Sequence, residues 1–285
     1  MLSPAEQWTA AYSENSKCRN GWECATHWNS DDMAGTYLTH TRDHLAEYEE
    51  KIAALALPPN AKILDIGSGP GAFAVPAAKR VAHVTAIEPA HGMYALLTRW
   101  CQTDHITNIT CIPKRWEDVP VPELNVPYDL VLASFSLGMP DIRTALLKMH
   151  AVCSGTVVCY WQAAAGAWEK LLTALTPELF GTEYTPAAKA PLLLEILAEE
   201  QIPATLEVTI RESRQTFSSL DNAVDTVAER LGAGKPEQRD RIAAYLQTVL
   251  TEEDGQWHLS GVTPPIGRLS WRGGWNPDDQ TQSQN

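Results

Sequence analysis

The sequence lacks a continuous apolar run of about 18 residues, the length that a membrane-spanning helix requires. Its first residues also lack the basic stretch and apolar core of a secretory signal, so we expect a cytoplasmic protein with no membrane partner. Positive charge is scarce. The 285 residues include 22 Lys and Arg residues and 35 Asp and Glu residues, so the formal net charge is −13. A broad phosphate-binding surface is therefore not expected, and nucleic acid is not predicted as a partner.

Cysteine is also sparse. The six cysteines are spread over the chain, which suits reduced thiols in a cytoplasmic enzyme. Cys18, Cys24 and His27 lie close in sequence, but their spacing is not a common zinc pattern and no second cysteine pair follows, so no metal is predicted. Hydrophobic residues make up 44% of the chain, which is enough to bury a sizeable core and excludes a wholly disordered protein.

Short apolar segments alternate with helical segments between residues 62 and 161. The apolar segments have no polar face, which is typical of strands in a doubly wound parallel sheet covered by helices. The strands that we predict are residues 63–66, 84–87, 109–112, 128–133 and 155–161. The helices that we predict are residues 36–57, 72–80, 93–100 and 142–152, the last with Asp141 as its N-cap.

The alternation stops after residue 161. Residues 164–201 are predicted to be helical, with interruptions near Pro177 and Pro186. Further predicted elements are a half-exposed strand at 205–210, helices at 220–231 and 236–250, and a final strand or hairpin at 257–271, broken at Pro264 and Pro265. The last ten residues, 276–285, have no apolar content and are predicted to be disordered.

The sharpest motif is Asp65-Ile66-Gly67-Ser68-Gly69-Pro70-Gly71, directly after the first predicted strand. Glycines are needed where the backbone approaches a ligand or adopts positive φ, and such a loop presents N–H groups at a helix start. Glu88 ends the second strand, where an acid can accept hydrogen bonds from both hydroxyls of a ribose.

Two cofactor classes fit this arrangement. Gly67, Gly69 and Ala72 satisfy a relaxed dinucleotide pattern, with Glu88 at about the right distance for a ribose. The Asp65 carboxylate would repel a pyrophosphate, whereas it suits a ligand that carries a cationic amine, such as the methionine part of S-adenosylmethionine.

These residues resemble the class I S-adenosylmethionine-dependent methyltransferases. The segments ILDIGSGPGAFAVPAAKR, VTAIEP, KRWEDVP and YDLVLASFSLGMPDIRTALLKM are similar to successive motifs of that family, and the resemblance covers roughly residues 60–161. It implies an α/β fold with a doubly wound, mostly parallel seven-stranded sheet and an antiparallel last strand. The expected divisions are an N-terminal arm and helix (1–58), an S-adenosylmethionine-binding core (59–161), a C-terminal half with helical acceptor-side insertions (162–275) and the tail (276–285).

The resemblance also implies roles for individual residues in binding S-adenosylmethionine. The residues that it places against the methionine part are Asp65, Gly67, Ser68 and Gly69. The residues that it places around the ribose and adenine are Glu88, Pro89, Met93, Trp116, Glu117 and Asp118, with Glu117 and Asp118 as alternatives for the adenine amine. Ser134 and Phe135 would lie under the sulfonium, from which the methyl group leaves to form S-adenosylhomocysteine.

The loop after the fourth strand bears on the acceptor. It reads Ala-Ser-Phe-Ser-Leu-Gly-Met-Pro at 133–140, without the Asn/Asp-Pro-Pro-aromatic motif of adenine and glutamine-amide methyltransferases and without a carboxylate or His. This apolar loop resembles that of small-molecule methyltransferases. Tyr37 and His40, on the helix before the first strand, are candidates for facing the methyl group or the acceptor, and Trp22 and Trp28 are candidates for lining its pocket.

Several alternatives remain open at this point. Arg211, Arg214, Arg268 and Arg272 are either surface charges or partners of an anionic acceptor. The protein is predicted to methylate a small molecule, and the alternatives are a methyltransferase acting on protein or RNA, a non-catalytic protein that binds S-adenosylmethionine or S-adenosylhomocysteine, and a nicotinamide-dependent oxidoreductase. The acceptor, the methylated atom and the oligomeric state are not predicted.

Overall fold

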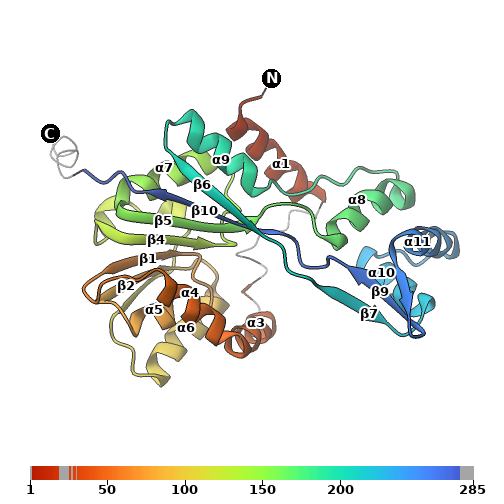
Figure 1. Cartoon of the computed structure of the whole chain (residues 1–285), viewed down its shortest axis with the longest axis horizontal. Coiled ribbons are helices and arrows are strands. Elements are labelled where there is room, and N and C mark those ends of the chain that lie inside the picture. Colours follow the sequence, from red (N-terminus) through yellow and green to blue (C-terminus); the bar gives the residue numbers. More distant parts are fainter. Residues whose placement is uncertain (1, 19–25, 27, 30, 277–285) are drawn as a thin grey trace.

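The computed structural model describes residues 2–18, 26, 28–29 and 31–276 (Figure 1). Trp22, Cys24 and His27, and the predicted tail beyond residue 276, lie outside these ranges. Among the described residues, no helix has the length and apolar content needed to cross a membrane.

A seven-stranded sheet forms the centre of the fold, in the order β3-β2-β1-β4-β5-β10-β6. Strand β10 runs antiparallel to both of its neighbours, and the pairs among β1 to β5 are parallel. The strands are β1 (Lys62–Ile66), β2 (His83–Ile87), β3 (Ile109–Ile112), β4 (Tyr128–Ser134), β5 (Cys153–Gln162), β6 (Ala204–Thr209) and β10 (Ile266–Arg272). The predicted fold class, a mostly parallel seven-stranded sheet with an antiparallel last strand, is confirmed.

Helices cover both faces of this sheet (Figure 1). The helices on one face are α4 (Leu45–Ala54), α5 (Ala74–Ala78) and α6 (His91–Thr103), which share an apolar core with β1 and β4. The helices on the other face are α1 (Pro4–Cys18), α7 (Ile142–Val152) and α9 (Ala190–Glu199), whose apolar side chains form a second core against the sheet. Burial on both faces explains why the central strands are apolar without alternation.

Three helix predictions need correction. The single helix expected at 36–57 is two helices, α3 (Asp31–Asp43) and α4, separated at His44, whose ring Nδ1 lies 2.9 Å from the main-chain oxygen of His40. Helix α5 is shorter than predicted, because residues 70–73 form turns that close the glycine-rich loop. Pro177 lies inside α8 (Ala167–Phe180), in its last turn, and the helix ends at Gly181, which has a positive φ of 69°.

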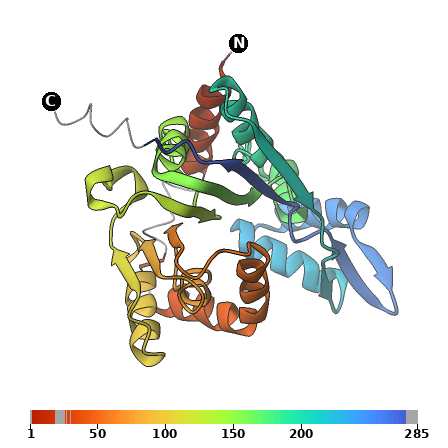
Figure 2. The same cartoon turned by 60° about the vertical axis from the view of Figure 1, so that its left-hand side comes forward.

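A separate lobe, residues 214–260, packs on α8 at one end of the molecule (Figures 1 and 2). Its elements are β7 (Arg214–Phe217), α10 (Leu220–Leu231), α11 (Pro236–Val249), β8 (Thr251–Glu253) and β9 (Gln256–Ser260). The helical pair was predicted, but the three-stranded sheet β7-β9-β8 was not. The hairpin expected at 257–271 is wrong, because β9 and β10 belong to different sheets.

Two short segments, residues 210–213 and 261–265, connect the lobe to the large sheet and form what we term the neck. The N–H of Gly261 donates to the main-chain oxygen of Ser213 at 2.7 Å. The N–H of Thr263 donates to Ser213 Oγ at 2.9 Å. The chain therefore leaves the sheet and returns to it at one hydrogen-bonded place.

Candidate active site

The glycine-rich loop between β1 and α5 requires its glycines. Gly67, Gly69 and Gly71 have φ values of 67°, 55° and 105°, a region that side chains other than hydrogen disfavour. A Cβ at Gly67 would lie 2.2 Å from Cβ of Ser136, so the loop after β4 packs directly against the glycine. The N–H groups of Gly67 and Ser68 donate to the main-chain oxygen of Ile87 at 2.8 and 3.0 Å, which ties the loop to the end of β2.

Glu88 projects from the end of β2 against this loop. Its Oε2 accepts a hydrogen bond from the N–H of Gly69 at 2.8 Å, and its Oε1 accepts one from the N–H of Ala90 at 2.7 Å. Burial raises the pKa of the Glu88 carboxyl, and these two N–H groups act in the opposite direction. A carboxylate oxygen can accept more than one hydrogen bond, so Glu88 retains capacity for ligand hydroxyls.

Asp65 is the most unusual group in the site. Its side chain is 2% exposed, and burial, with a smaller effect of the nearby Glu88 charge, raises the pKa of Asp65 to about 7. Asp65 Oδ2 and Ser68 Oγ are both buried without a hydrogen-bond partner among the described residues. Buried polar atoms normally have partners, so these two mark a place for a polar ligand group. A cationic amine fits, because it would supply both donors and charge.

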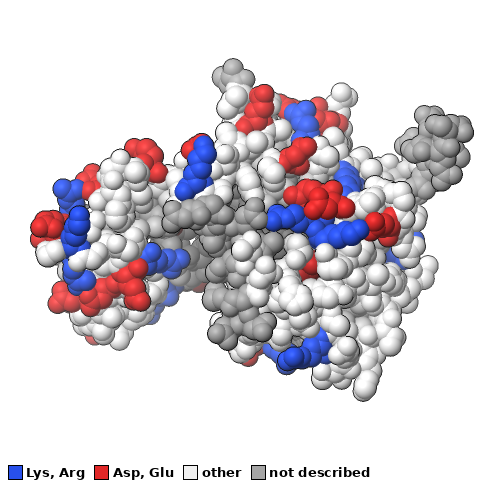
Figure 3. All heavy atoms as spheres, turned by 180° about the vertical axis from the view of Figure 1, so that it is seen from behind, with Lys and Arg blue, Asp and Glu red and all other residues white. Residues whose placement is uncertain are grey.

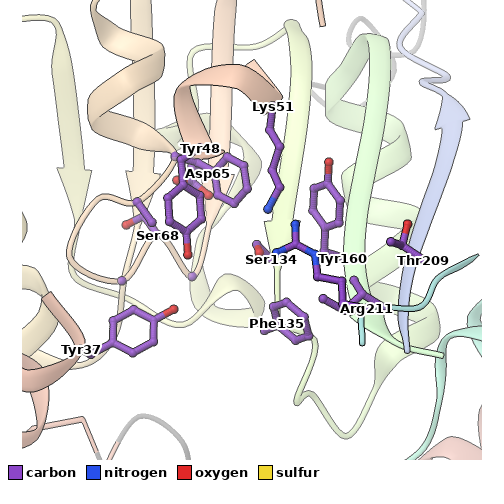
Figure 4. Close-up of a pocket in the computed structure, with 15 residues that line it drawn as sticks. Tyr37, Tyr48, Lys51, Asp65, Ser68, Ser134, Phe135, Tyr160, Thr209 and Arg211 are labelled. Carbon is purple, nitrogen blue, oxygen red and sulfur yellow. The ribbon is translucent and has the colours of Figure 1, made fainter. Parts of the chain in front are cut away.

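A cavity of about 550 Å³ opens at the carboxyl ends of β1, β2 and β4, within the range of small-molecule sites. A smaller cavity of about 150 Å³ adjoins it and contains Asp65 and Ser68 (Figure 4). The sequence-predicted residues that line the larger cavity are Tyr37, Gly67, Gly69, Glu88, Pro89, Met93, Trp116, Glu117, Ser134 and Phe135. Asp118, predicted for the cofactor, and His40, predicted for the acceptor, line neither cavity.

The wall predicted to face adenine is rigid. Trp116 lies in a short 3-10 helix, η1 (Trp116–Asp118), with 2% of its surface exposed, and its indole N–H donates to the main-chain oxygen of Ala145 at 3.2 Å. The Lys148 ammonium lies 4.0 Å from the centre of the Trp116 ring. Trp116 is therefore both a core residue and a cavity wall. Glu117 and Asp118 are both exposed, and of the two only Glu117 reaches the cavity lining.

Phe135 lies where the two cavities meet. It has a φ of 53°, which is uncommon for a residue with a large side chain, and its N–H donates to the main-chain oxygen of Tyr160 at 2.9 Å. The ring is 45% exposed and lines both cavities, with its centre 6.4 Å from that of Trp161. Backbone strain of this kind persists at functional sites because the surrounding structure holds it.

Helix α1, in the N-terminal arm expected on the lid or acceptor side, supplies a wall whose residues the sequence analysis did not name as site residues. Its residues Trp8, Tyr12, Asn15 and Ser16 line the larger cavity. The Trp8 indole N–H donates to the main-chain oxygen of Met139 at 2.9 Å, which fastens α1 to the loop after β4. The spacing of positions 8, 12, 15 and 16 places these side chains on one helical face, and this signal was available in the sequence.

The remaining candidates are divided between the site and the surface. Tyr37 lines both cavities, and its ring centre lies 5.2 Å from that of Trp28, which lines the larger cavity. His40 is exposed and stacks on the ring of His44 with a centroid distance of 4.3 Å. Arg211 lines the smaller cavity.

The other three predicted arginines lie elsewhere. Arg214 and Arg268 pair with Glu253 and Glu207 at 3.1 and 2.9 Å. Arg272 is exposed at the end of β10. In the described part of the chain, no cluster of three or more His, Cys, Asp or Glu side chains is arranged to hold a metal ion.

The doubly wound sheet, the glycine-rich loop and the acid at the end of β2 define a nucleotide-cofactor-binding domain. Residues 63–155 match the family model described as a methyltransferase domain. This segment of the chain is therefore similar to methyltransferase domains.

Comparison with individual proteins supports the fold. An uncharacterized protein of Haemophilus influenzae is 32% identical over 107 residues, which span 36% of this chain and only 38% of that protein. The YcgJ protein of Bacillus subtilis has a TM-score of 0.52 at 13% identity, covering 80% of this chain and 98% of that one. A proposed methyltransferase of Bacillus halodurans has a TM-score of 0.53 at 15% identity, covering 79% and 99%. At these identities, the two structures show a shared fold.

Proposed function

We propose that the protein is an S-adenosylmethionine-dependent methyltransferase that acts on a small molecule. The observation that carries the proposal is the pair of buried acids around the glycine-rich loop. Asp65 keeps an unpartnered buried oxygen for an amine, and Glu88 is held at the end of β2 with capacity for ribose hydroxyls. The Asp65 carboxylate is poorly suited to a pyrophosphate, which disfavours a nicotinamide cofactor.

We propose the following roles for parts of the site in binding the cofactor. Met93 and Trp116 form apolar walls for the adenine, and Glu117 is the acid within reach of its amine. Bound S-adenosylmethionine supplies an electrophilic methyl group on its sulfonium. Ser134 and Phe135, at the end of β4, line both cavities and border the place where that methyl group would face an acceptor.

The catalytic contribution that we propose is positioning and the exclusion of water, as in-line displacement requires. Trp8, Phe135, Met139 and Trp161 line the larger cavity and give its acceptor side an apolar character. The 133–140 loop offers no carboxylate or His for proton removal, so a base for an acceptor that keeps its proton has to come from another part of the cavity lining, where Tyr37 is the candidate.

The shape and charge of the protein favour a small acceptor. The larger cavity lies beneath α1 and is lined by side chains from both halves of the chain. On the face shown in Figure 3, Lys and Arg side chains are interspersed with Asp and Glu side chains and do not gather into one basic surface. A large anionic polymer is therefore a poor match for this face.

Titration calorimetry tests the cofactor assignment directly. We expect S-adenosylmethionine and S-adenosylhomocysteine to bind with micromolar affinity, NADH not to bind, and Asp65→Ala and Glu88→Ala each to lose binding. Gly234→Ala, in the lobe, is the matched control and should bind as the wild type does, because nothing lies within 4 Å of the added Cβ. Binding of NADH by folded protein that binds neither S-adenosyl compound would refute the proposal.

Radiolabelled transfer tests the acceptor class. The protein is incubated with S-adenosylmethionine carrying a labelled methyl group and a cell extract divided by ultrafiltration. We expect label in the low-molecular-weight fraction. Label in the protein fraction alone would favour the protein-directed alternative, and cofactor binding without transfer to either fraction would favour a non-catalytic binding protein.

A further inference from the structure

The smaller cavity contains a pair of cationic side chains that the proposed cofactor site does not use. Lys51 comes from α4 and Arg211 from the neck, and both line this cavity together with Ser134, Phe135 and Tyr160. In Figure 4 the two side chains extend from opposite sides toward the same space above Phe135. This convergence is unusual for a chain with a formal net charge of −13.

The Lys51 ammonium is surrounded by aromatic rings instead of acceptors. It lies 5.2, 5.9 and 5.8 Å from the ring centres of Tyr48, Phe73 and Tyr160. Among the described residues it has no hydrogen-bond acceptor and no carboxylate within ion-pair distance. An ammonium group carries three donors, and half-buried aromatic rings do not replace the acceptors that water or an anion would supply.

The two cations also repel each other. Burial lowers the pKa of the Lys51 ammonium, and the Arg211 charge lowers it further, whereas Glu47 acts in the opposite direction. Glu47 offsets only one of the two positive charges, because its carboxylate pairs with Arg211 at 3.0 Å, where both side chains are about half exposed. An oxyanion between Lys51 and Arg211 would satisfy the free donors and relieve the repulsion.

The position of the pair favours the acceptor over the cofactor as the source of that anion. Asp65 Oδ2 and Ser68 Oγ, both buried without a partner among the described residues, already provide polar groups for the methionine part. Lys51 and Arg211 both lie outside residues 63–155, the segment that matches the methyltransferase family model. The cavity also extends away from the loop, toward Thr209 and Ile266 near the ends of β6 and β10.

We propose that Lys51 and Arg211 bind a carboxylate or phosphate group of the methyl acceptor, so that the substrate class is an anionic small molecule. This inference rests on the proposed methyltransferase function. Ser134 and Phe135 border both cavities, so an acceptor anchored by its anionic group between the two cations has its remaining part next to the methyl-transfer position. Lys51 and Arg211 act as binding and positioning residues.

The first arm of the test uses the labelled low-molecular-weight extract. Products are separated on an anion-exchange resin, and we expect the label in the retained, anionic fraction. Lys51→Met and Arg211→Met should each reduce transfer about 10- to 100-fold, as expected for the loss of one charged hydrogen-bonding partner. Lys51→Arg keeps the charge and should recover most of the activity, and Lys79→Met, an exposed lysine on the neighbouring α5 C-terminus, should have no effect.

The second arm separates the acceptor from the cofactor as the source of the anion. Calorimetry with S-adenosylhomocysteine should give the same affinity for the wild type, Lys51→Met and Arg211→Met. Weaker binding of S-adenosylhomocysteine by these variants, with unchanged binding of methylthioadenosine, which lacks the amino-acid part, would overturn the proposal by assigning the pair to the cofactor carboxylate.

The third arm needs neither acceptor nor turnover. Phosphate, compared with chloride at equal ionic strength, should raise the Tm of the wild type more than that of the Lys51→Met/Arg211→Met double variant. Equal phosphate effects on both proteins would overturn the anion site. Label confined to neutral or cationic products would overturn the substrate class but leave the methyltransferase function intact, whereas absence of S-adenosylmethionine binding would refute that function itself.

Discussion

Replacing Asp65 by Asn should destroy the cofactor site, and the stability of the free variant relative to the wild type should increase as the pH rises. The ordinary pKa of an Asp is 3.8, and burial raises the pKa of Asp65 to about 7 in the folded protein. Between these values, the folded state holds a proton that the unfolded state has released. The free energy of unfolding of the wild type therefore falls as the pH rises through this window, and this loss is complete above about pH 7.

The magnitude follows from the size of the pKa difference. Roughly three pKa units at about 1.4 kcal/mol each correspond to a loss on the order of 4 kcal/mol between about pH 4 and pH 8. Asn cannot ionise, so Asp65→Asn should not show this loss. A buried amide without partners has its own cost of about 1–3 kcal/mol, but that cost is independent of pH and cancels when the two pH profiles are compared.

Urea unfolding of the free protein at several pH values between about 4 and 8 measures the effect. The difference in free energy of unfolding between Asp65→Asn and the wild type should grow with pH by several kcal/mol. Asp240→Asn, at an exposed position of α11, is the matched control and should follow the wild type. Parallel profiles for Asp65→Asn and the wild type would refute the argument that burial raises the pKa of Asp65.

Three further predictions concern the same site. Glu88→Gln should weaken S-adenosylmethionine binding by about 1.5–3 kcal/mol in calorimetry, because the ribose hydroxyls lose a charged acceptor, and unchanged affinity would contradict that role. Gly67→Ala should lower the Tm by several degrees, because the new Cβ would lie 2.2 Å from Ser136 Cβ at a φ of 67°, whereas Gly234→Ala should not. Trp8→Phe should cost about 1–3 kcal/mol of unfolding free energy by leaving the carbonyl beneath α1 without its donor, and a neutral effect in urea unfolding would show that α1 is held by packing alone.

The central fold was predictable because its signals are local. Strands β1 to β5 are short, apolar and separated by helical segments, and each predicted strand lies within two residues of the observed bounds. Asp141 caps α7 as predicted, with its Oδ1 accepting from the N–H of Thr144 at 3.1 Å. The glycine-rich loop and Glu88 were assigned correctly to one place, because the carboxyl ends of neighbouring parallel strands meet at one edge of a sheet.

The lobe sheet could not be predicted in the same way. All three residues of β8 are exposed, and β7 buries one residue, so neither strand carries a hydrophobic alternation that distinguishes it from a loop. The predicted helix is divided at His44, and its first half, α3, contacts α6. Such tertiary contacts leave no periodic trace in the sequence.

The cationic residues of the smaller cavity were also not predictable from the sequence. Arg211 was one of four arginines considered for an anionic acceptor, and the sequence offered no reason to choose it. Lys51 was not considered at all, because its role depends on the meeting of α4 with the neck, two segments far apart in the chain. Side chains that converge from distant elements are visible only once the fold is known.

The hydrogen-bonded neck allows the lobe to be replaced as a unit. Since the chain departs and returns where Gly261 and Thr263 both donate hydrogen bonds to Ser213, the intervening segment can lengthen, shrink or be exchanged without changing the register of β10 between β5 and β6. Evolution and protein engineering therefore have access to the same junction. Arg211 lies in the neck and outside the lobe, so an exchange of residues 214–260 would leave this cavity-lining side chain in place.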